Sequence, residues 1–473
     1  MAAFSRKDEQ FRQYALTAPP LKVLLTVSLP LALYQALHQI FKVLDTLMAS
    51  HIGADAVSAV AALSQITLMI NALGSGLAVG GCIKISEAYG MGDYVLVRKR
   101  VATVYAMAVA VSAAVCLTLI PFAEGFLHLL HTPEELITAG AGYFRVEVLT
   151  LVVSFFNTVY IAIERSRGHA RKILLLNLCV ILVKLALSAL FVYVLHGGLI
   201  LIAAATLISQ CLIFIYAMVS MPRDEGAFRF SRSCISLKKR TLLPIVNLSL
   251  PVSHEKILFA GGKVIVNAMS GIYGSLTVGA LGISNNIGGL TTSWHVGFTD
   301  GTAPLISQNR GAGKYRRTLH LYFWLMAVNV AVGVLGLGLV SLTLPWLARI
   351  FAMSKDTYNP AFHQMIVDIH RWEMLGYITL GVNSATVALL LGYGYSRLTM
   401  LLNAARVFLF RVPVLWAFQR FTTLDYEAVG LTMMISNVAT GLSAVAIAIP
   451  VVWRILRKAR AQESAAQASA SPE

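Results

Sequence analysis

Four polar residues interrupt an apolar stretch near the start of the chain. They are Gln35, His38, Lys42 and Asp45. Their spacings of three, four and three residues place all four side chains on one face of a helix. An apolar environment favours the protonated acid at Asp45, whereas the ammonium group of Lys42 one turn away favours its carboxylate. Asp45 could therefore bind and release a proton, or hold a sodium ion. The alternative is a Lys42–Asp45 ion pair that only neutralises the helix.

Other polar residues lie in apolar stretches, where they are costly and are therefore candidates for function. Lys184 needs a carboxylate partner, which Asp45 or Glu147 could supply, either as a structural ion pair or as part of a binding site. Asp300 is an acid of the second half of the chain. The remaining candidates for a polar cavity are Asn157, Glu255, Lys256, Lys263 and Asn383.

Two further groups of residues can be read in two ways. Glu147 and Glu373 occupy equivalent places in an internal repeat, and this duplication favours a structural role over a specialised site. Arg406 and Arg411 either line a cavity of the second half or cap neighbouring helix ends.

The composition shows what kind of element must position these residues. The 473 residues are 57% hydrophobic and only 13% charged. Stretches of about 20 nearly uncharged residues recur, each long enough to cross a bilayer. The sequence predicts an all-α polytopic membrane protein without a cleavable signal peptide. Its twelve predicted spans are 21–48, 57–83, 101–123, 137–163, 172–195, 198–221, 243–270, 276–301, 318–346, 365–391, 396–419 and 427–453.

The net charge of +16 is distributed unevenly over the predicted loops. Loops on the side of the N-terminus hold 27 lysines and arginines, and the opposite loops hold 3. This asymmetry follows the positive-inside rule and predicts that both termini are cytoplasmic in the plasma (cell inner) membrane. The charge therefore indicates membrane topology, and we expect no binding of nucleic acid.

The chain consists of two related halves. Residues 28–94 recur at 249–315, with 18 identities in 67 positions, and 145–177 recur at 371–403, with 10 in 33. Because each half has an even number of spans, the halves run the same way through the membrane, with a substrate path at their interface. The predicted divisions are a cytoplasmic segment 1–20, lobes 21–221 and 243–455, a cytoplasmic linker 222–242 and a disordered tail 456–473.

The sequence lacks the motifs of several classes of enzyme and of metal sites. The chain contains no phosphate-binding GxxxxGK[ST] loop, no HExxH and no GxSxG motif. Its five cysteines are scattered without metal spacing. We therefore expect no cofactor, no metal site and no enzymatic activity, and an ion gradient or a partner must supply energy.

The motifs resemble those of the multidrug and toxic compound extrusion (MATE) transporters. The resemblance extends from about residue 20 to 455 and rests on the order and duplication of individually weak motifs. These are Ser-Leu-Pro at 28–30 and 249–251, Leu-Asp-Thr at 44–46 followed by Gly53, the Gly76/Gly80 run leading to Gly-Met-Gly at 90–92, and Asn-Arg-Gly-Ala-Gly at 309–313.

The resemblance implies two six-helix lobes in a V shape and export of organic compounds against inflow of H⁺ or Na⁺. Asp45 matches the first-helix aspartate of the family's N-lobe cation site, and Asn157 matches its fourth-helix asparagine. The chain has Lys184 and Ser188 where many members carry Asn and Asp, and no acid near Leu380, which favours protons. The added lysines keep an anionic or zwitterionic substrate open.

We therefore expect a proton-coupled exporter of small organic compounds that works by alternating access as a monomer in contact with membrane lipid. A flippase for a lipid-linked saccharide or another lipid of the same superfamily is the alternative, in which intramembrane basic residues would hold a pyrophosphate. An intramembrane enzyme such as an acyltransferase is a third reading, but the repeat carries no nucleophile and base together.

Overall fold

The computed structural model describes the backbone of residues 6–49, 54–122, 124–125, 134–195, 199–224, 226–354 and 357–470. Side chains are described for residues 8–42, 67–122, 124–125, 142–192, 194–195, 200–224, 226–352, 358–465 and 467.

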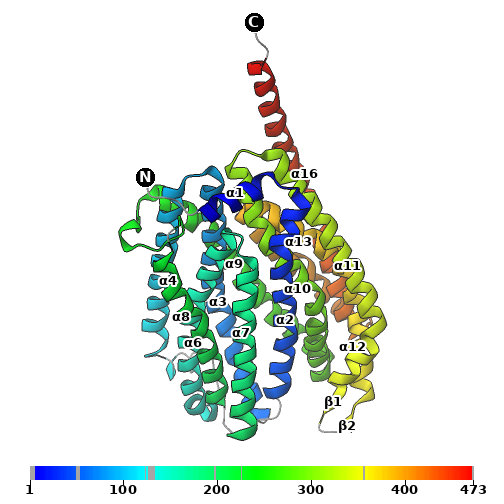
Figure 1. Ribbon diagram of the computed structural model, residues 1–473. Coiled ribbons are helices and arrows are strands. Elements are labelled where there is room, and N and C mark those ends of the chain that lie inside the picture. The colour runs from blue at the N-terminus through cyan, green and yellow to red at the C-terminus, as the bar shows by residue number, and fades with distance from the viewer. Residues whose placement is uncertain are drawn as a thin grey trace. The chain divides into compact units, whose positions relative to one another are not determined.

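The first half is a series of long helices (Figure 1). They are α1 (Arg6–Thr17), α2 (Pro20–Ala49), α3 (Ala54–Met91), α4 (Tyr94–Leu119), α6 (Glu134–Ser166), α7 (Ala170–Ala189) continued by the π-helical η1 (Leu190–Val194), and α8 (Leu199–Arg223).

The second half follows the same plan, with two of its spans interrupted by non-α turns. It comprises η2 (Arg232–Cys234), α9 (Lys239–Ser270), η3 (Gly271–Tyr273), α10 (Ser275–Gly311), α11 (Tyr315–Ala352), the two-residue antiparallel strands β1 (Met353–Ser354) and β2 (Thr357–Tyr358), α12 (Pro360–Glu373), the 3₁₀ turn η4 (Met374–Gly376), α13 (Tyr377–Gly392), α14 (Ser396–Ala405), the π-helical η5 (Arg406–Arg411), α15 (Val412–Phe421) and α16 (Glu427–Ala470).

The predicted fold class is confirmed, because, within the described residues, each of the twelve predicted spans is a helix or a run of consecutive helices apart from a few residues at its ends. Ten of these segments, within the described residues, are long and apolar enough to cross a membrane. The two that fall outside this group are α9 and α10, which contain many Ser, Thr, Asn and His residues.

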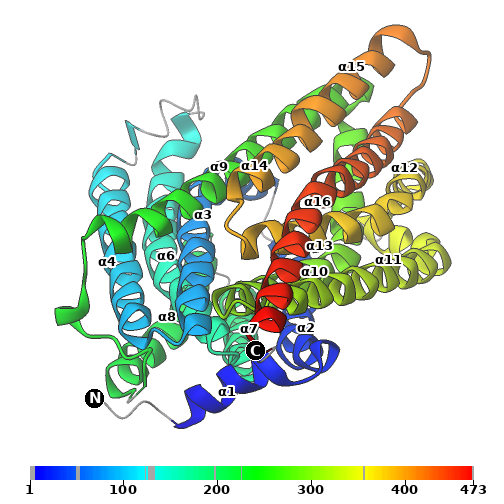
Figure 2. The same cartoon turned by 90° about the horizontal axis from the view of Figure 1, so that it is seen from above.

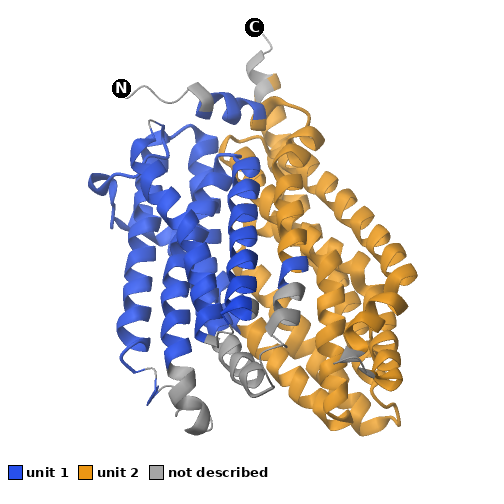
Figure 3. Ribbon diagram, turned by 60° about the horizontal axis from the view of Figure 1, so that its bottom comes forward, with its two compact units in different colours: residues 1–14, 40–257 blue, residues 15–39, 258–473 orange. Residues whose placement is uncertain are grey.

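The chain packs as two compact units (Figure 3). Unit 1 contains residues 1–14 and 40–257, and unit 2 contains residues 15–39 and 258–473. The beginning of α2 therefore belongs to unit 2, and the beginning of α9 belongs to unit 1. The lobe boundaries inferred from the repeat remain a prediction. In unit 1, α3 packs against α4 and α6, and in unit 2, α10 packs against α11 and α13 (Figure 2).

Glycines that recur in the repeat allow helices to approach closely in both units. In unit 1, a Cβ at Gly80 would lie 2.0 Å from the Ser249 side chain on α9. In unit 2, a Cβ at the equivalent Gly301 would lie 2.4 Å from Ser28 on α2. The same serine–glycine pairing thus holds α9 to α3 in unit 1 and α2 to α10 in unit 2.

Another set of duplicated glycines ends helices at turns. Gly92 and Gly313 have φ values of 76° and 73°, and Gly168 and Gly394 have values of 76° and 79°. L side chains rarely adopt this conformation, which explains why glycine occupies these turns in both halves.

The N-terminal segment, predicted only as a cytoplasmic stretch, forms a helix, α1. In unit 1, Oδ1 of the buried Asp8 accepts hydrogen bonds from Arg167 Nε at 3.2 Å and Nη2 at 3.0 Å. Arg167 also pairs with Asp224. Burial lowers the pKa of Arg167, but the neighbouring carboxylates outweigh it and raise the pKa above the ordinary value.

The prediction of a disordered tail is corrected by the structure. Helix α16 continues to Ala470, because Ala, Glu and Gln are good helix formers and Arg316 pairs with Glu463 at 3.0 Å.

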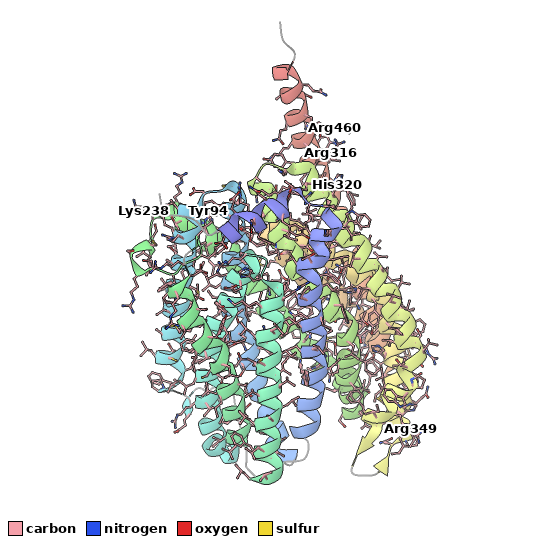
Figure 4. The ribbon with its side chains drawn as sticks, in the orientation of Figure 1. Tyr94, Lys238, Arg316, His320, Arg349 and Arg460 are labelled. Atoms are coloured by element: carbon pink, nitrogen blue, oxygen red, sulfur yellow. The ribbon has the colours of Figure 1, made fainter. Side chains whose placement is uncertain are left out.

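Basic residues of unit 2 gather at the end of the bundle where α16 emerges. Figure 4 shows Arg316, His320 and Arg460 at this end and Arg349 at the opposite end. In unit 1, Lys238 and Tyr94 lie at the end where α1 lies.

Replacing Asp8 with Asn should destabilise unit 1. The Asp8→Asn change leaves the buried Arg167 with one charged partner fewer, which we expect to cost about 1–3 kcal/mol. The measurement is the thermal unfolding midpoint of the detergent-purified protein. Glu463→Gln is the control, since its exposed ion pair contributes about 0–1 kcal/mol. Equal midpoints for both variants would contradict the structural role of Asp8.

Replacing Gly297 with Ala should destabilise unit 2. The added Cβ would lie 2.2 Å from the Ala32 Cα on α2, so the two helices must separate, at an expected cost of about 1–3 kcal/mol. Gly282→Ala on the same helix meets nothing within 4 Å and serves as the control, with an unchanged or higher unfolding midpoint. A wild-type midpoint for Gly297→Ala would refute the close contact.

Candidate functional site

The predicted polar line on α2 is partly visible in the structure. In unit 2, Gln35 Nε2 donates to Asp300 Oδ2 at 3.4 Å, so two predicted site residues meet. The His38 ring lies 5.9 Å from the Tyr34 ring, and Lys42 is exposed. Asp45 lies on α2, but its side chain falls outside the described residues.

The contact between α2 and α10 continues one turn beyond Gln35. Gln39 Nε2 donates to the Asn286 carbonyl oxygen at 3.2 Å. A Cβ at Gly289 would lie 2.3 Å from this same Gln39 amide. Amide groups on α2 therefore bond to α10 in a region where hydrocarbon cannot satisfy them.

In unit 1, two predicted residues are joined to partners on neighbouring helices. Asn157 Nδ2 donates to the Gln210 carbonyl at 2.8 Å and to Gln210 Oε1 at 2.9 Å, while its own buried Oδ1 accepts no hydrogen bond. Lys184 interacts electrostatically with Glu147, which also accepts a hydrogen bond from Tyr143 at 3.3 Å. Glu147 is one of the two partners that the sequence offered for Lys184.

The three candidate residues on α9 are at least partly exposed. Glu255 is half-buried, and Lys256 and Lys263 are exposed. The Lys263 ammonium lies 5.2 Å from the centre of the Phe259 ring, which is a cation–π distance.

In the second half, Asn383 is buried on α13, and its Oδ1 accepts no hydrogen bond. On α10, the buried His295 lies 3.1 Å, through Nε2, from the Asn329 carbonyl oxygen. Asn329 itself is fully buried on α11. His295 thus makes a polar contact between α10 and α11, and Asn383 lies on α13, which packs against both helices in unit 2.

A further polar cluster of unit 2 could not be assembled from the sequence. Arg406 and Arg411 on η5 both donate to Asn437 on α16, and Glu373 accepts from Ser284 on α10. The sequence signal was the pair of arginines in an apolar span and the Ser-Asn dipeptide at 436–437 in another. Sequence spacing could not show that these two spans meet or that Glu373 lies within electrostatic range of both arginines.

No metal site emerges from the part of the chain with described side chains, since no three His, Cys, Asp or Glu side chains group together there. What the arrangement offers chemically is a set of polar and charged groups on membrane helices. The side-chain groups present are carboxylate, ammonium, guanidinium and amide.

Comparison with known proteins places the chain in a family. The MatE family model matches residues 30–190 and 251–417, one match in each half of the chain. The chain is 21% identical over 384 residues to the probable multidrug resistance protein YoeA of Bacillus subtilis, covering 79% of this chain and 81% of the relative. It is also 21% identical over 329 residues to the multidrug export protein MepA of Staphylococcus aureus, covering 68% and 72%.

Solved structures show the same fold. A MATE transporter in complex with MaL6 superposes with a TM-score of 0.89 at 18% identity, covering 94% of this chain and 99% of that chain. A multidrug resistance MATE family transporter of the MOP superfamily gives a TM-score of 0.88 at 18% identity, covering 96% and 99%. With the family match extending over both halves, the chain belongs to the MatE family, the multidrug and toxic compound extrusion transporters, as a multi-pass membrane protein.

Proposed function

We propose that this protein exports small organic compounds across the plasma membrane in exchange for protons, as a monomer with both termini in the cytoplasm. The family supports export, because the relatives YoeA and MepA are named for multidrug resistance and multidrug export. The gathering of basic residues at one end of unit 2 supports the orientation.

The observation that carries the coupling proposal is the polar face of α2. This helix has residues in both compact units, 20–39 in unit 2 and 40–49 in unit 1. In unit 2 its face is fixed by the bond from Gln35 to Asp300. Two turns or more further along, Lys42 and Asp45 continue the same face. A change in the charge of Asp45 would therefore affect α2, the helix that is also hydrogen-bonded to α10 through Gln35.

In the proposed cycle, a proton from outside neutralises Asp45 and removes its interaction with a basic partner such as Lys42 or Lys184. The helices around it then repack, and the substrate is released. Binding of a new substrate from the cytoplasm favours the deprotonated form, so the proton leaves inward. Each ligand shifts the balance because it binds one conformation better than the other.

Protons are favoured over sodium because Lys184 and Ser188 occupy places where many family members carry Asn and Asp. The Lys184 ammonium lies in the electrostatic range of Glu147. A cation in this region of unit 1 would repel a sodium ion, whereas a carboxyl group can take up a proton beside it.

The test is transport by purified protein in proteoliposomes with an imposed pH gradient. Asp45→Asn should lower export of a cationic or anionic dye to the level of protein-free liposomes, because an amide cannot exchange the proton. Expression and the detergent elution profile should stay unchanged. Asp425→Asn, at an exposed acid in the loop before α16, is the matched control and should transport like wild type.

Two results would contradict the proposal. Export at the wild-type rate by Asp45→Asn would remove the coupling role of this residue. Export driven by a sodium gradient at constant pH, but not by a pH gradient, would show that sodium is the coupling ion.

A further inference from the structure

Two arginines inside one span of unit 2 share a neutral partner. Arg406 Nη2 donates to Asn437 Oδ1 at 2.8 Å, and Arg411 Nη2 donates to the same oxygen at 3.3 Å. Arg411 Nε donates to Ser436 Oγ at 3.2 Å. An amide and a hydroxyl satisfy hydrogen bonds but carry no charge. Both guanidinium groups therefore need a counter-charge from elsewhere, since an uncompensated charge within a span is costly.

Glu373 acts electrostatically on both arginines, but its close contacts are with other residues. Its carboxylate accepts a hydrogen bond from Ser284, and Oε2 lies 3.8 Å from His370 Nδ1. No ion pair within 4.0 Å joins it to Arg406 or Arg411 among the residues with described side chains. Among the described side chains of this cluster, two positive charges therefore face one negative charge.

The unsatisfied atoms of the cluster are donors. Arg406 Nε and Asn437 Nδ2 are buried and have no hydrogen-bond partner. Asn437 is 1% exposed, and its orientation follows from chemistry, because a flipped amide would direct its NH₂ group at two guanidinium groups. Positive charge combined with vacant donors matches a ligand that is anionic and accepts hydrogen bonds.

A third cation lies beside the arginines. The Phe259 ring on α9 has the Arg406 guanidinium 5.4 Å from its centre and the Lys263 ammonium at 5.2 Å. Arg411 is buried, Arg406 is half-buried and Lys263 is exposed. Exposure of Lys263 toward hydrocarbon would be costly, so this side of the cluster is better explained as facing water.

The backbone is irregular around these side chains. Both arginines lie on the π-helical η5, near the middle of the 26-residue span Ser396–Phe421. The 3₁₀ turn η4 divides the span Pro360–Gly392, and a Cβ at its Gly376 would lie 2.6 Å from Asn437 Cβ. Helix α16 packs on both irregular segments. Non-α backbone within a span is typical of places that are buried in protein or line a binding site.

We propose that Arg406, Arg411, Asn437 and Lys263, the guanidinium cluster, bind the oxyanion of a transported organic compound. The class of substrate is an organic anion or zwitterion that carries a carboxylate, sulfonate or phosphate group. A guanidinium pair matches the planar geometry of such groups, and the two unpaired donors complete their coordination. This inference rests on the proposed export function, in which the cluster supplies the site for the substrate's negative end.

A purely structural role predicts something different. If the arginines only fastened η5 to α16, an acid at position 437 would strengthen the attachment and change nothing else. If they bind a ligand, the same acid occupies the site and removes it. Asn437→Asp is isosteric and separates these two outcomes.

The experiment measures dye binding to the full-length protein in detergent, by fluorescence polarisation, without any gradient. The probes are a xanthene dye with a free carboxylate and the ethyl ester of the same dye. Wild type should bind the carboxylate form at least about tenfold more tightly than the ester, as a charge-assisted bond implies.

Arg406→Gln and Asn437→Asp should each weaken binding of the carboxylate dye about tenfold and leave binding of the ester unchanged. Asn437→Asp should keep or raise the thermal unfolding midpoint, so the loss is not unfolding. Arg420→Gln, an exposed arginine on α15 near the end of the same span, is the control and should bind both dyes like wild type. Wild-type affinity of Asn437→Asp for the carboxylate dye would overturn the proposal, as would equal loss of both dyes.

An anionic lipid headgroup could offer the same chemistry, and a second arm distinguishes the two sources. Binding of the carboxylate dye in nanodiscs of phosphatidylcholine should not change when phosphatidylglycerol is added. Displacement by phosphatidylglycerol would assign the cluster to lipid and overturn its role for substrate. Because binding needs no gradient, failure of pH-driven transport with the dye preference intact would refute the exporter function alone.

Discussion

Every polar group inside the hydrocarbon-crossing part of this protein must find a partner within the protein, and this constraint organises both units. It explains why Gln35 and Gln39 bond to α10, why Asn157 bonds twice to Gln210, and why Lys184 lies near Glu147. An excess of hydrogen-bond donors or positive charges over their partners is therefore informative. Such an excess costs free energy, and packing of the helices alone does not require it.

The internal repeat produces the same close helix–helix contact in both units. Serine on the first helix of each half meets glycine in both units, with Ser28 at Gly301 and Ser249 at Gly80. These small residues allow the helix backbones to approach closely. Within a bilayer, burial of apolar surface does not favour helix association, so close packing of this kind must stabilise it. The shared architecture therefore follows from residues that the repeat retains.

The halves differ where the charged groups lie. The first half has Asp45 where the second has Val266, and the second half has two arginines in a span, Arg406 and Arg411. We propose a titratable acid for coupling in the first half and a basic cluster for the substrate's negative end in the second. The two halves thus share the residues that pack their helices but differ in the charged residues that we propose for function.

The sequence by itself determined the all-α fold, the twelve spans, the repeat and the family. These follow from long apolar stretches and from glycines such as Gly92 and Gly313, whose positive φ is a local requirement. It also identified single polar residues, because a charge in an apolar stretch is visible without coordinates. It did not predict helix α1 or the helical continuation of α16 to Ala470, since tertiary contacts such as Asp8 with Arg167 stabilise these polar segments. Only the tertiary structure decided that α2 begins in unit 2, that Arg406 and Arg411 share Asn437, and that Glu373 lies within electrostatic range of both arginines. Periodicity shows which face of a helix is polar, but the partner of that face depends on contacts between residues far apart in the chain.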